Sequence, residues 1–257
     1  MKFSIIGLPK SGKTTIFNAL THSVAEDKFK KENTKIVKVP DLRVEFFAKT
    51  FSSKKIVPPE IQVFDFQGFE LKGEVRNVDA YVVVLRKFEN PLHPFSGPEK
   101  PIDQLKAILE EMVITDLSIV ENRLNSLKRI PDKKAVDQSE VKVLEHCQTL
   151  LTDGKLLRLH IKELPELNYL QGFQLSTLKP SVICINVSDE YIGKYDSPEF
   201  KNILDFCREF HFEYLFLPGA TEEELADLNE KDAEEYMEAV GIKAPGIKKL
   251  IEKSFNA

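Results

Sequence analysis

The stretch Gly7-Leu8-Pro9-Lys10-Ser11-Gly12-Lys13-Thr14 is a complete GxxxxGK[ST] pattern. An apolar run at residues 3–6 has the character of a strand, and a helix-forming run at residues 15–20 follows the pattern. Glycines at such a junction let the backbone curl so that successive N–H groups point at phosphate oxygens, while the helix adds its positive end. The pattern therefore predicts a phosphate-binding loop.

We expect the residues of this loop to have distinct roles toward a nucleoside triphosphate. Lys13 is predicted to reach the β- and γ-phosphates as a catalytic cation, and Thr14 to place its hydroxyl on Mg²⁺. The predicted nucleotide-binding residues of this segment are Gly7, Leu8, Pro9, Lys10, Ser11, Gly12, Lys13, Thr14 and Thr15.

A second predicted metal ligand follows another buried strand. The run IQVFDFQG at residues 61–68 places Asp65 near the end of an apolar strand and gives a DxxG pattern with Gly68. We expect Asp65 to hold the metal through water, and the Gly68 N–H to contact the γ-phosphate in catalysis.

Recognition of the base is expected at a later strand end. Residues 182–189, VICINVSD, offer an NxxD pattern in which Asn186 and Asp189 face a purine. A carboxylate accepts from both guanine N1–H and its exocyclic amine, which favours GTP slightly over ATP. Val187 occupies the position where GTPases usually carry Lys, and the missing Lys favours adenine instead. An ordinary strand-end turn remains the alternative interpretation of the pattern.

The apolar pattern predicts an α/β fold, a mostly parallel sheet with helices on both faces. The central segment differs, because residues 102–127 carry an apolar stripe at helical spacing and residues 141–151 carry a second one. These stripes predict an antiparallel helical hairpin, or alternatively two ordinary core helices. The predicted strands are residues 3–6, 61–66, 80–85, 182–185 and 214–217.

Composition excludes several classes of protein. The 257 residues have a formal net charge of −5, so the chain as a whole is not a nucleic-acid polycation. Its three cysteines lie far apart and form no zinc pattern. With no signal peptide or membrane span in the sequence, we expect a cytoplasmic protein. We also expect a monomer. The basic segment 28–55 is expected to be a solvated loop face, and it permits contact with RNA phosphates.

Several of these motifs, in the same order, resemble the Obg-related, YchF-type family of P-loop NTPases. The resemblance covers nearly the whole chain and implies a G domain with an inserted helical coiled-coil arm, nucleoside-triphosphate hydrolysis with Mg²⁺, and association with ribosomes. The matching segments include GLPKSGKTTIFNALT at 7–21, NVDAYVVVLRKFENP at 77–91, EEMVITDLSIVENRL at 110–124 and LKPSVICINVSDE at 178–190.

By this resemblance the G domain comprises residues 1–100 and 173–220, the arm 101–172 and a helical tail 221–257. The chain also departs from the family pattern. Phe29 falls where the family has its switch I Thr, with Thr34 nearby, and the segment after Gly68 is short. The polar residue of the base loop is lost at Pro218-Gly219-Ala220, and the family's C-terminal TGS domain is expected to be absent.

Three functions are compatible with these features. The first is a slow, Mg²⁺-dependent NTPase that works as a switch in translation. The second is a nucleotide-binding scaffold that barely hydrolyses, which the switch departures favour. The third, a small-molecule kinase, needs an Arg-rich lid, and the central segment carries an apolar stripe instead.

Overall fold

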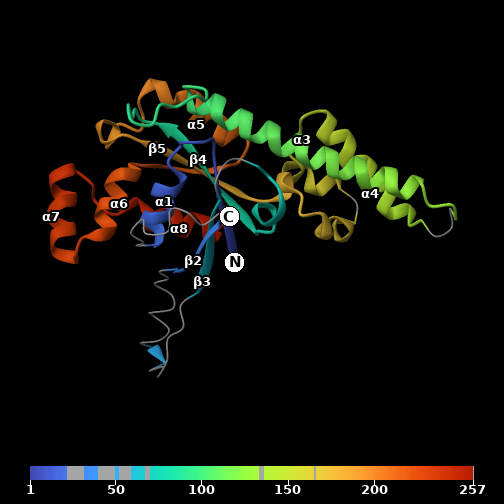
Figure 1. Ribbon diagram of the computed structural model, residues 1–257, viewed down its shortest axis with the longest axis horizontal. Coiled ribbons are helices and arrows are strands. Elements are labelled where there is room, and N and C mark those ends of the chain that lie inside the picture. Colours follow the sequence, from blue (N-terminus) through green and yellow to red (C-terminus); the bar gives the residue numbers. More distant parts are fainter. Residues whose placement is uncertain are drawn as a thin grey trace. The chain divides into compact units, whose positions relative to one another are not determined.

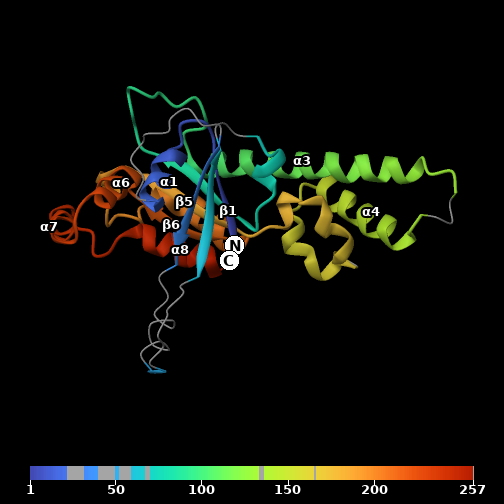
Figure 2. The ribbon, with the colours of Figure 1, turned by 60° about the horizontal axis from the view of Figure 1, so that its bottom comes forward.

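The computed structural model describes residues 1–21, 32–39, 50–51, 59–66, 70–132, 136–164 and 166–256. Its centre is a sheet whose six described strands run in the order β2-β3-β1-β4-β5-β6 (Figures 1 and 2). All neighbours from β3 to β6 pair in parallel. The strands are β1 (Lys2–Ile6), β2 (Glu32–Lys38), β3 (Glu60–Phe66), β4 (Ala80–Lys87), β5 (Ser181–Val187) and β6 (Glu213–Leu217). The predicted α/β class and its parallel sheet are confirmed.

Strand β2 corrects the expectation of a loop in the basic segment 28–55. It pairs antiparallel with β3 along its whole length, from Glu32 opposite Phe66 to Lys38 opposite Glu60. Charged and polar residues fill β2, and its Ile36 side chain is exposed. An edge strand with this composition satisfies its backbone through one neighbour only, and period-2 hydrophobicity is therefore too weak to reveal it in the sequence.

The chain folds into two compact units. The first unit comprises Met1–Phe69, Asp79–Gln104 and Ser181–Ala257, and it contains the sheet. Among the described residues its helices include α1 (Lys13–Thr21), α5 (Lys201–Glu209), α6 (Gly219–Asp227), α7 (Glu230–Val240) and α8 (Gly246–Asn256), with 3₁₀ turns at Asp189–Tyr191 and Pro198–Phe200.

One core of the first unit forms where α1 and α8 pack on the same sheet face. Every second residue of β1, β4 and β5 enters it, as the pleat requires. Its members include Phe3, Ile5, Ile16, Phe17, Val82, Val84, Val182, Cys184, Leu217, Leu250 and Ile251. Residues 246–256, which belong to the expected helical tail 221–257, form α8 and contribute Ile247, Leu250 and Ile251 to this core.

The second unit comprises Glu70–Val78 and Leu105–Pro180. Helix α3 (Pro101–Lys128) starts in the first unit, and α4 (Gln138–Thr152) lies beside it in both views (Figures 1 and 2). Arg123 of α3 pairs with Glu140 of α4 at 2.6 Å. Short 3₁₀ turns complete the unit at Gly73–Arg76, Leu157–Glu163, Leu167–Phe173 and Ser176–Leu178. Among the described residues, no helix has the length and apolarity needed to cross a bilayer.

Candidate nucleotide site

A cavity of about 590 Å³ opens at the carboxyl ends of the parallel strands. Strand β1 lies between β3 and β4, so the strand order of the sheet reverses at β1. Open α/β sheets bind ligands at such a reversal, outside the carboxyl ends of the strands. We call it the strand-edge cavity. It is lined by Pro9, Lys10, Gly12, Lys13, Thr14, Thr15, Phe66, Arg86, Phe88, Glu89, Asn90, His93, Asn186, Val187, Ser188, Asp189, Ala220 and Glu223.

The loop after β1 has the curled backbone that its sequence predicts. Gly7 has a φ of 157° and Gly12 a φ of 92°. A Cβ on Gly7 would lie 2.4 Å from the Val84 carbonyl oxygen, and one on Gly12 would lie 2.2 Å from Asn186 Nδ2. Both glycines are therefore required by the close approach of β4 and β5 as well as by the backbone angle.

The ammonium group of Lys13 lies inside this curl. Its Nζ donates to the Gly7 carbonyl at 2.9 Å and to the Leu8 carbonyl at 3.2 Å, and the residue is only 7% exposed. Burial lowers the pKa of Lys13, and the nearby Asp65 charge opposes that shift. An anion that enters the loop stabilises this buried cation, because the low local dielectric strengthens the attraction between the two charges.

Asp65 lies next to this cation and is also buried, at 5% exposure. The Thr14 hydroxyl donates to Asp65 Oδ2 at 2.8 Å, whereas Oδ1 has no partner among the described residues. Burial raises the pKa of Asp65, and the Thr14 hydrogen bond and the Lys13 charge oppose the rise. A hydroxyl beside a carboxylate with a spare oxygen is a hard donor set of the kind that suits Mg²⁺. The residues present therefore fit the predicted metal.

Asn186 holds two loops together at the end of β5. Its Nδ2 donates to the Ser11 carbonyl at 3.2 Å, and its Oδ1 accepts from the Gly219 N–H at 3.0 Å. The side chain is 3% exposed, so both hydrogen bonds form away from water, where a hydrogen bond is electrostatically stronger. Asn186 thus fixes the phosphate loop against the loop that starts α6, and it lines the cavity between them.

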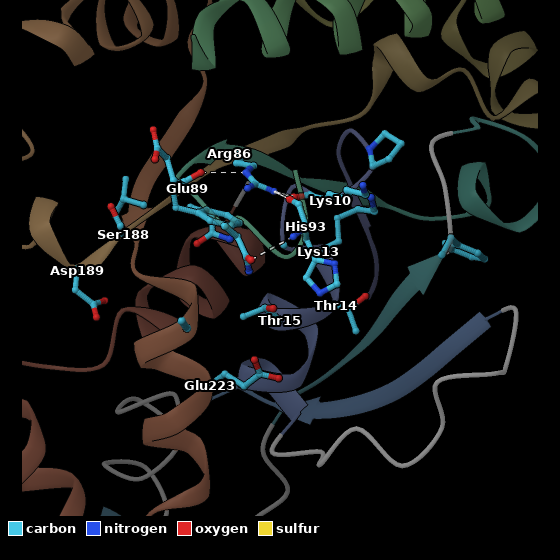
Figure 3. A pocket seen from close by; sticks show the side chains of 18 residues that line it. Lys10, Lys13, Thr14, Thr15, Arg86, Glu89, His93, Ser188, Asp189 and Glu223 are labelled. Carbon is cyan, nitrogen blue, oxygen red and sulfur yellow. Dashed lines mark hydrogen bonds between the residues drawn. The ribbon is translucent and has the colours of Figure 1, made fainter. Parts of the chain in front are cut away.

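Asp189 lies at the far end of the cavity from the phosphate loop, and Val187 also lines the cavity. Figure 3 shows Lys10, Lys13 and Thr14 on one side, and Ser188 and Asp189 on the other. The Thr221 hydroxyl donates to Asp189 Oδ1. Thr221 follows the segment 218–220 in which the sequence had lost its polar residue, so the helix α6 supplies a hydroxyl one position later.

Four predicted residues that the structure describes are not among those that line the cavity: Gly7, Leu8, Ser11 and Asp65. Gly7 and Leu8 contribute carbonyls to Lys13, and Ser11 contributes one to Asn186. Gly68 and Phe29 lie outside the described residues. Thr34 lies in β2 opposite Phe64, with an exposed side chain, and is not among the residues that line the cavity.

The sequence interpretation missed the loop that follows β4. Phe88, Glu89, Asn90 and His93 of this loop line the cavity, and so does Arg86 at the end of the strand. A usable signal existed, since these residues lie at or just after the carboxyl end of a buried parallel strand, and Asp65 and Asn186 also lie at such strand ends. Parallel strands end at one edge, so polar residues after each of them converge there.

Comparisons with known proteins point to one family. The chain is 27% identical to "Ribosome-binding ATPase YchF" of Haemophilus influenzae, over 99% of this chain and 75% of that protein. It is 28% identical to "Obg-like ATPase 1" of Oryza sativa subsp. indica, over 100% of this chain and 70% of that protein. The solved Schizosaccharomyces pombe YchF GTPase superposes with a TM-score of 0.78 at 25% identity, covering 100% of this chain and 75% of that one.

The resemblance to the Obg-related, YchF-type P-loop NTPases is confirmed. No family model matches the chain. The structural similarity also confirms the predicted P-loop NTPase fold, and with it the class of enzyme expected from the phosphate loop.

Proposed function

We propose that this chain binds a purine nucleoside triphosphate with Mg²⁺ and hydrolyses its γ-phosphate slowly, with GTP modestly favoured over ATP. The observation that carries the proposal is the arrangement of Lys13 and Asp65. The buried Lys13 ammonium lies inside the phosphate loop, and the buried Asp65 carboxylate on β3, which has a spare oxygen, lies near it. Burying these two charged groups costs free energy. A metal-bound polyphosphate offsets that cost, because its phosphates pair with Lys13 and its metal ion with Asp65.

The residues of the chain have separable roles in this reaction. Lys13 exchanges its carbonyl partners for phosphate oxygens and neutralises the charge that develops on them. Thr14 and Asp65 would hold Mg²⁺, which supplies further charge neutralisation at the phosphates. Asn186 keeps the phosphate loop and the α6 loop in register. Hydrolysis is expected to be slow, because Phe69 follows Gly68 where a Gln could otherwise orient the attacking water.

A multiple-turnover phosphate-release assay tests hydrolysis. Lys13→Ala and Asp65→Ala should each reduce the rate by at least about 100-fold, while Lys72→Ala, which removes an exposed lysine paired with Glu70, leaves it unchanged. If Lys13→Ala and Asp65→Ala hydrolyse at the wild-type rate, the activity belongs to a contaminant. A wild-type chain that binds nucleotide but shows no turnover would support the scaffold function instead.

Asp189 is the residue proposed to discriminate between bases. Its carboxylate, oriented by the Thr221 hydroxyl, accepts from guanine N1–H and repels the adenine N1 lone pair. Calorimetric titration should show GTP binding up to about tenfold more tightly than ATP, a difference of about 1.4 kcal/mol. Asp189→Ala should remove this preference, and Glu190→Ala, the adjacent exposed carboxylate, should retain it. A preference that survives Asp189→Ala would disprove the assignment.

We also propose that the chain is a cytoplasmic, ribosome-associated monomer. Support comes from relatives named as ribosome-binding ATPases and from the basic composition of segment 28–55. Sedimentation of the purified chain with ribosomes, at low and at high salt, measures this association. Contacts to RNA phosphates predict binding that weakens as salt rises, because counterions are released on binding.

A further inference from the structure

Arg86 is a buried cation at the edge of the nucleotide site. It is the last residue but one of β4, it is 4% exposed, and it lines the strand-edge cavity. Burying a guanidinium costs several kcal/mol unless its donors are satisfied. Its contacts should therefore show what the burial achieves.

The guanidinium connects the loop after β4 to the phosphate loop. Its Nε donates to the Phe88 carbonyl at 3.0 Å, and Nη1 donates to the His93 carbonyl at 3.1 Å and to the Lys10 carbonyl at 2.8 Å. It also lies over the Phe88 ring at 4.1 Å and near the Phe95 ring at 5.2 Å. All three hydrogen-bond acceptors in the described part of the chain are main-chain carbonyls, so the positive charge stays available to an anion in the cavity.

The backbone of Arg86 is itself fixed by Gln104. The Gln104 Oε1 accepts from the Arg86 N–H at 2.7 Å, and its Nε2 donates to the Arg86 carbonyl at 2.8 Å. Strand β1 pairs with β4 only as far as Ile6 opposite Val83. The Gln104 amide, 1% exposed, thus pairs with the strand beyond the point where β1 turns away into the phosphate loop. Arg86 therefore reaches the loop from a rigid support.

Arg86 and Asn186 act on consecutive peptides of the phosphate loop. They lie directly opposite each other in the β4–β5 register. Asn186 holds the Ser11 carbonyl, and Arg86 holds the carbonyl of Lys10, whose φ of 64° is unusual for a non-glycine residue. A strained peptide persists only where its surroundings hold it, and two adjacent strand ends do so here.

We propose that Arg86 is a positioning residue of the nucleotide site, which supplies from β4 the cation that Val187 leaves out of the base motif on β5. By holding the Lys10 carbonyl, Arg86 keeps the loop curled, and its charge adds to the field that attracts phosphate. The inference rests on the proposed function, because a site that binds no nucleotide needs no such support.

Affinity for a fluorescent GTP analogue, together with kcat and KM, tests this role. Arg86→Ala should weaken binding about 30-fold and raise KM, with a smaller change in kcat at saturation. Arg86→Lys, which keeps the charge but lacks the planar fork, should lose less. In the Arg86→Ala background, Val187→Lys should restore much of the affinity. The control Lys87→Ala removes the adjacent cation, which pairs with Glu199 at 3.0 Å, and should leave affinity unchanged.

Thermal unfolding without nucleotide separates this role from a purely structural one. A folded Arg86→Ala variant with wild-type affinity would overturn the inference. If Arg86→Ala does not fold, Arg86→Lys decides, because a melting temperature that falls without any change in affinity would also overturn it. No recovery by Val187→Lys would overturn the exchange of one cation for the other. A wild-type chain that fails to bind GTP would instead remove the proposed function.

Discussion

Two buried aspartates, Asp65 in the first, sheet-containing unit and Asp116 in the second, helical unit, differ in how many hydrogen bonds they accept. Asp65 accepts one hydrogen bond, from Thr14, and its other oxygen has no partner among the described residues. Asp116, 0% exposed on α3, accepts from the Ser176 N–H at 3.0 Å, and from the Thr177 N–H and hydroxyl at 2.7 Å each. Burial raises the pKa of both carboxyl groups.

Burial alone therefore does not distinguish an acid that binds a ligand from an acid that makes internal hydrogen bonds and stabilises the fold. The helical unit uses Asp116 internally, to fix the 3₁₀ turn at Ser176–Leu178 against α3. The sheet-containing unit leaves one oxygen of Asp65 without a partner among the described residues, next to Lys13 and Thr14, which line the cavity. Such an arrangement stays unfavourable until a ligand binds. The number of hydrogen-bond partners of a buried acid is the more informative observation.

Matched substitutions of the two aspartates should give the largest effect and test the comparison directly. Asp65→Asn should lower phosphate release at least about 100-fold without lowering the free energy of unfolding, since it removes a poorly satisfied charge. Asp116→Asn should lower the free energy of unfolding by about 2 kcal/mol, because an amide donor then faces the Thr177 donors. Its phosphate release, measured on folded protein, should stay near the wild-type rate. Equal effects of both substitutions on hydrolysis would break the comparison.

The pH dependence of the free energy of unfolding should show a smaller effect, which isolates the contribution of Asp116. The folded pKa of Asp116 lies above its ordinary value of 3.8 because burial outweighs the hydrogen bonds. The folded state therefore binds this proton more tightly than the unfolded state does, and the associated stability is present below pH 3.8 and lost as pH rises through the raised pKa. Urea denaturation between pH 4 and pH 7 should show the wild type losing stability relative to Asp116→Asn as pH rises. A constant difference across this range would contradict the raised pKa.

Substitution of Glu222 should have the smallest effect on the free energy of unfolding. Glu222 is a buried acid of the sheet-containing unit and, like Asp116, it accepts more than one hydrogen bond. It is 2% exposed and accepts from the Gly246 N–H at 2.6 Å and the Ile247 N–H at 3.2 Å, at the start of α8. Glu222→Gln keeps an acceptor but loses the charge that complements the helix terminus, so we expect a loss of about 1 kcal/mol in unfolding free energy. Affinity for GTP should not change. The exposed Glu235→Gln serves as control in the same denaturation series.

Much of the sheet-containing unit was predictable from the sequence because its signals are local. Apolar runs bounded by polar residues gave the five parallel strands, and the glycine spacing located the phosphate loop between β1 and α1. Asp65 and Asn186 could be placed by the rule that parallel strands end at one edge. Likewise, the two helical stripes correspond to α3 and α4.

The remaining features depend on partners distant in the chain. Arg86 looks like the polar end of a strand until Lys10, 76 residues away, is seen to accept its hydrogen bond. Strand β2 exists through its pairing with β3, and its own sequence is too polar to predict it. Asp116 reads as a helix-surface residue until Ser176 and Thr177 fold onto it. Tertiary context decides all three.

Calorimetric titration of GTP with and without Mg²⁺, into the wild type and into Asp65→Asn, tests whether Asp65 holds the metal of the nucleotide site. If Asp65 and Thr14 form the metal side of the nucleotide site, Mg²⁺ should tighten GTP binding to the wild type by at least about tenfold, and Asp65→Asn should lose that gain while retaining metal-free binding through Lys13. An equal gain from Mg²⁺ in both proteins would contradict the account.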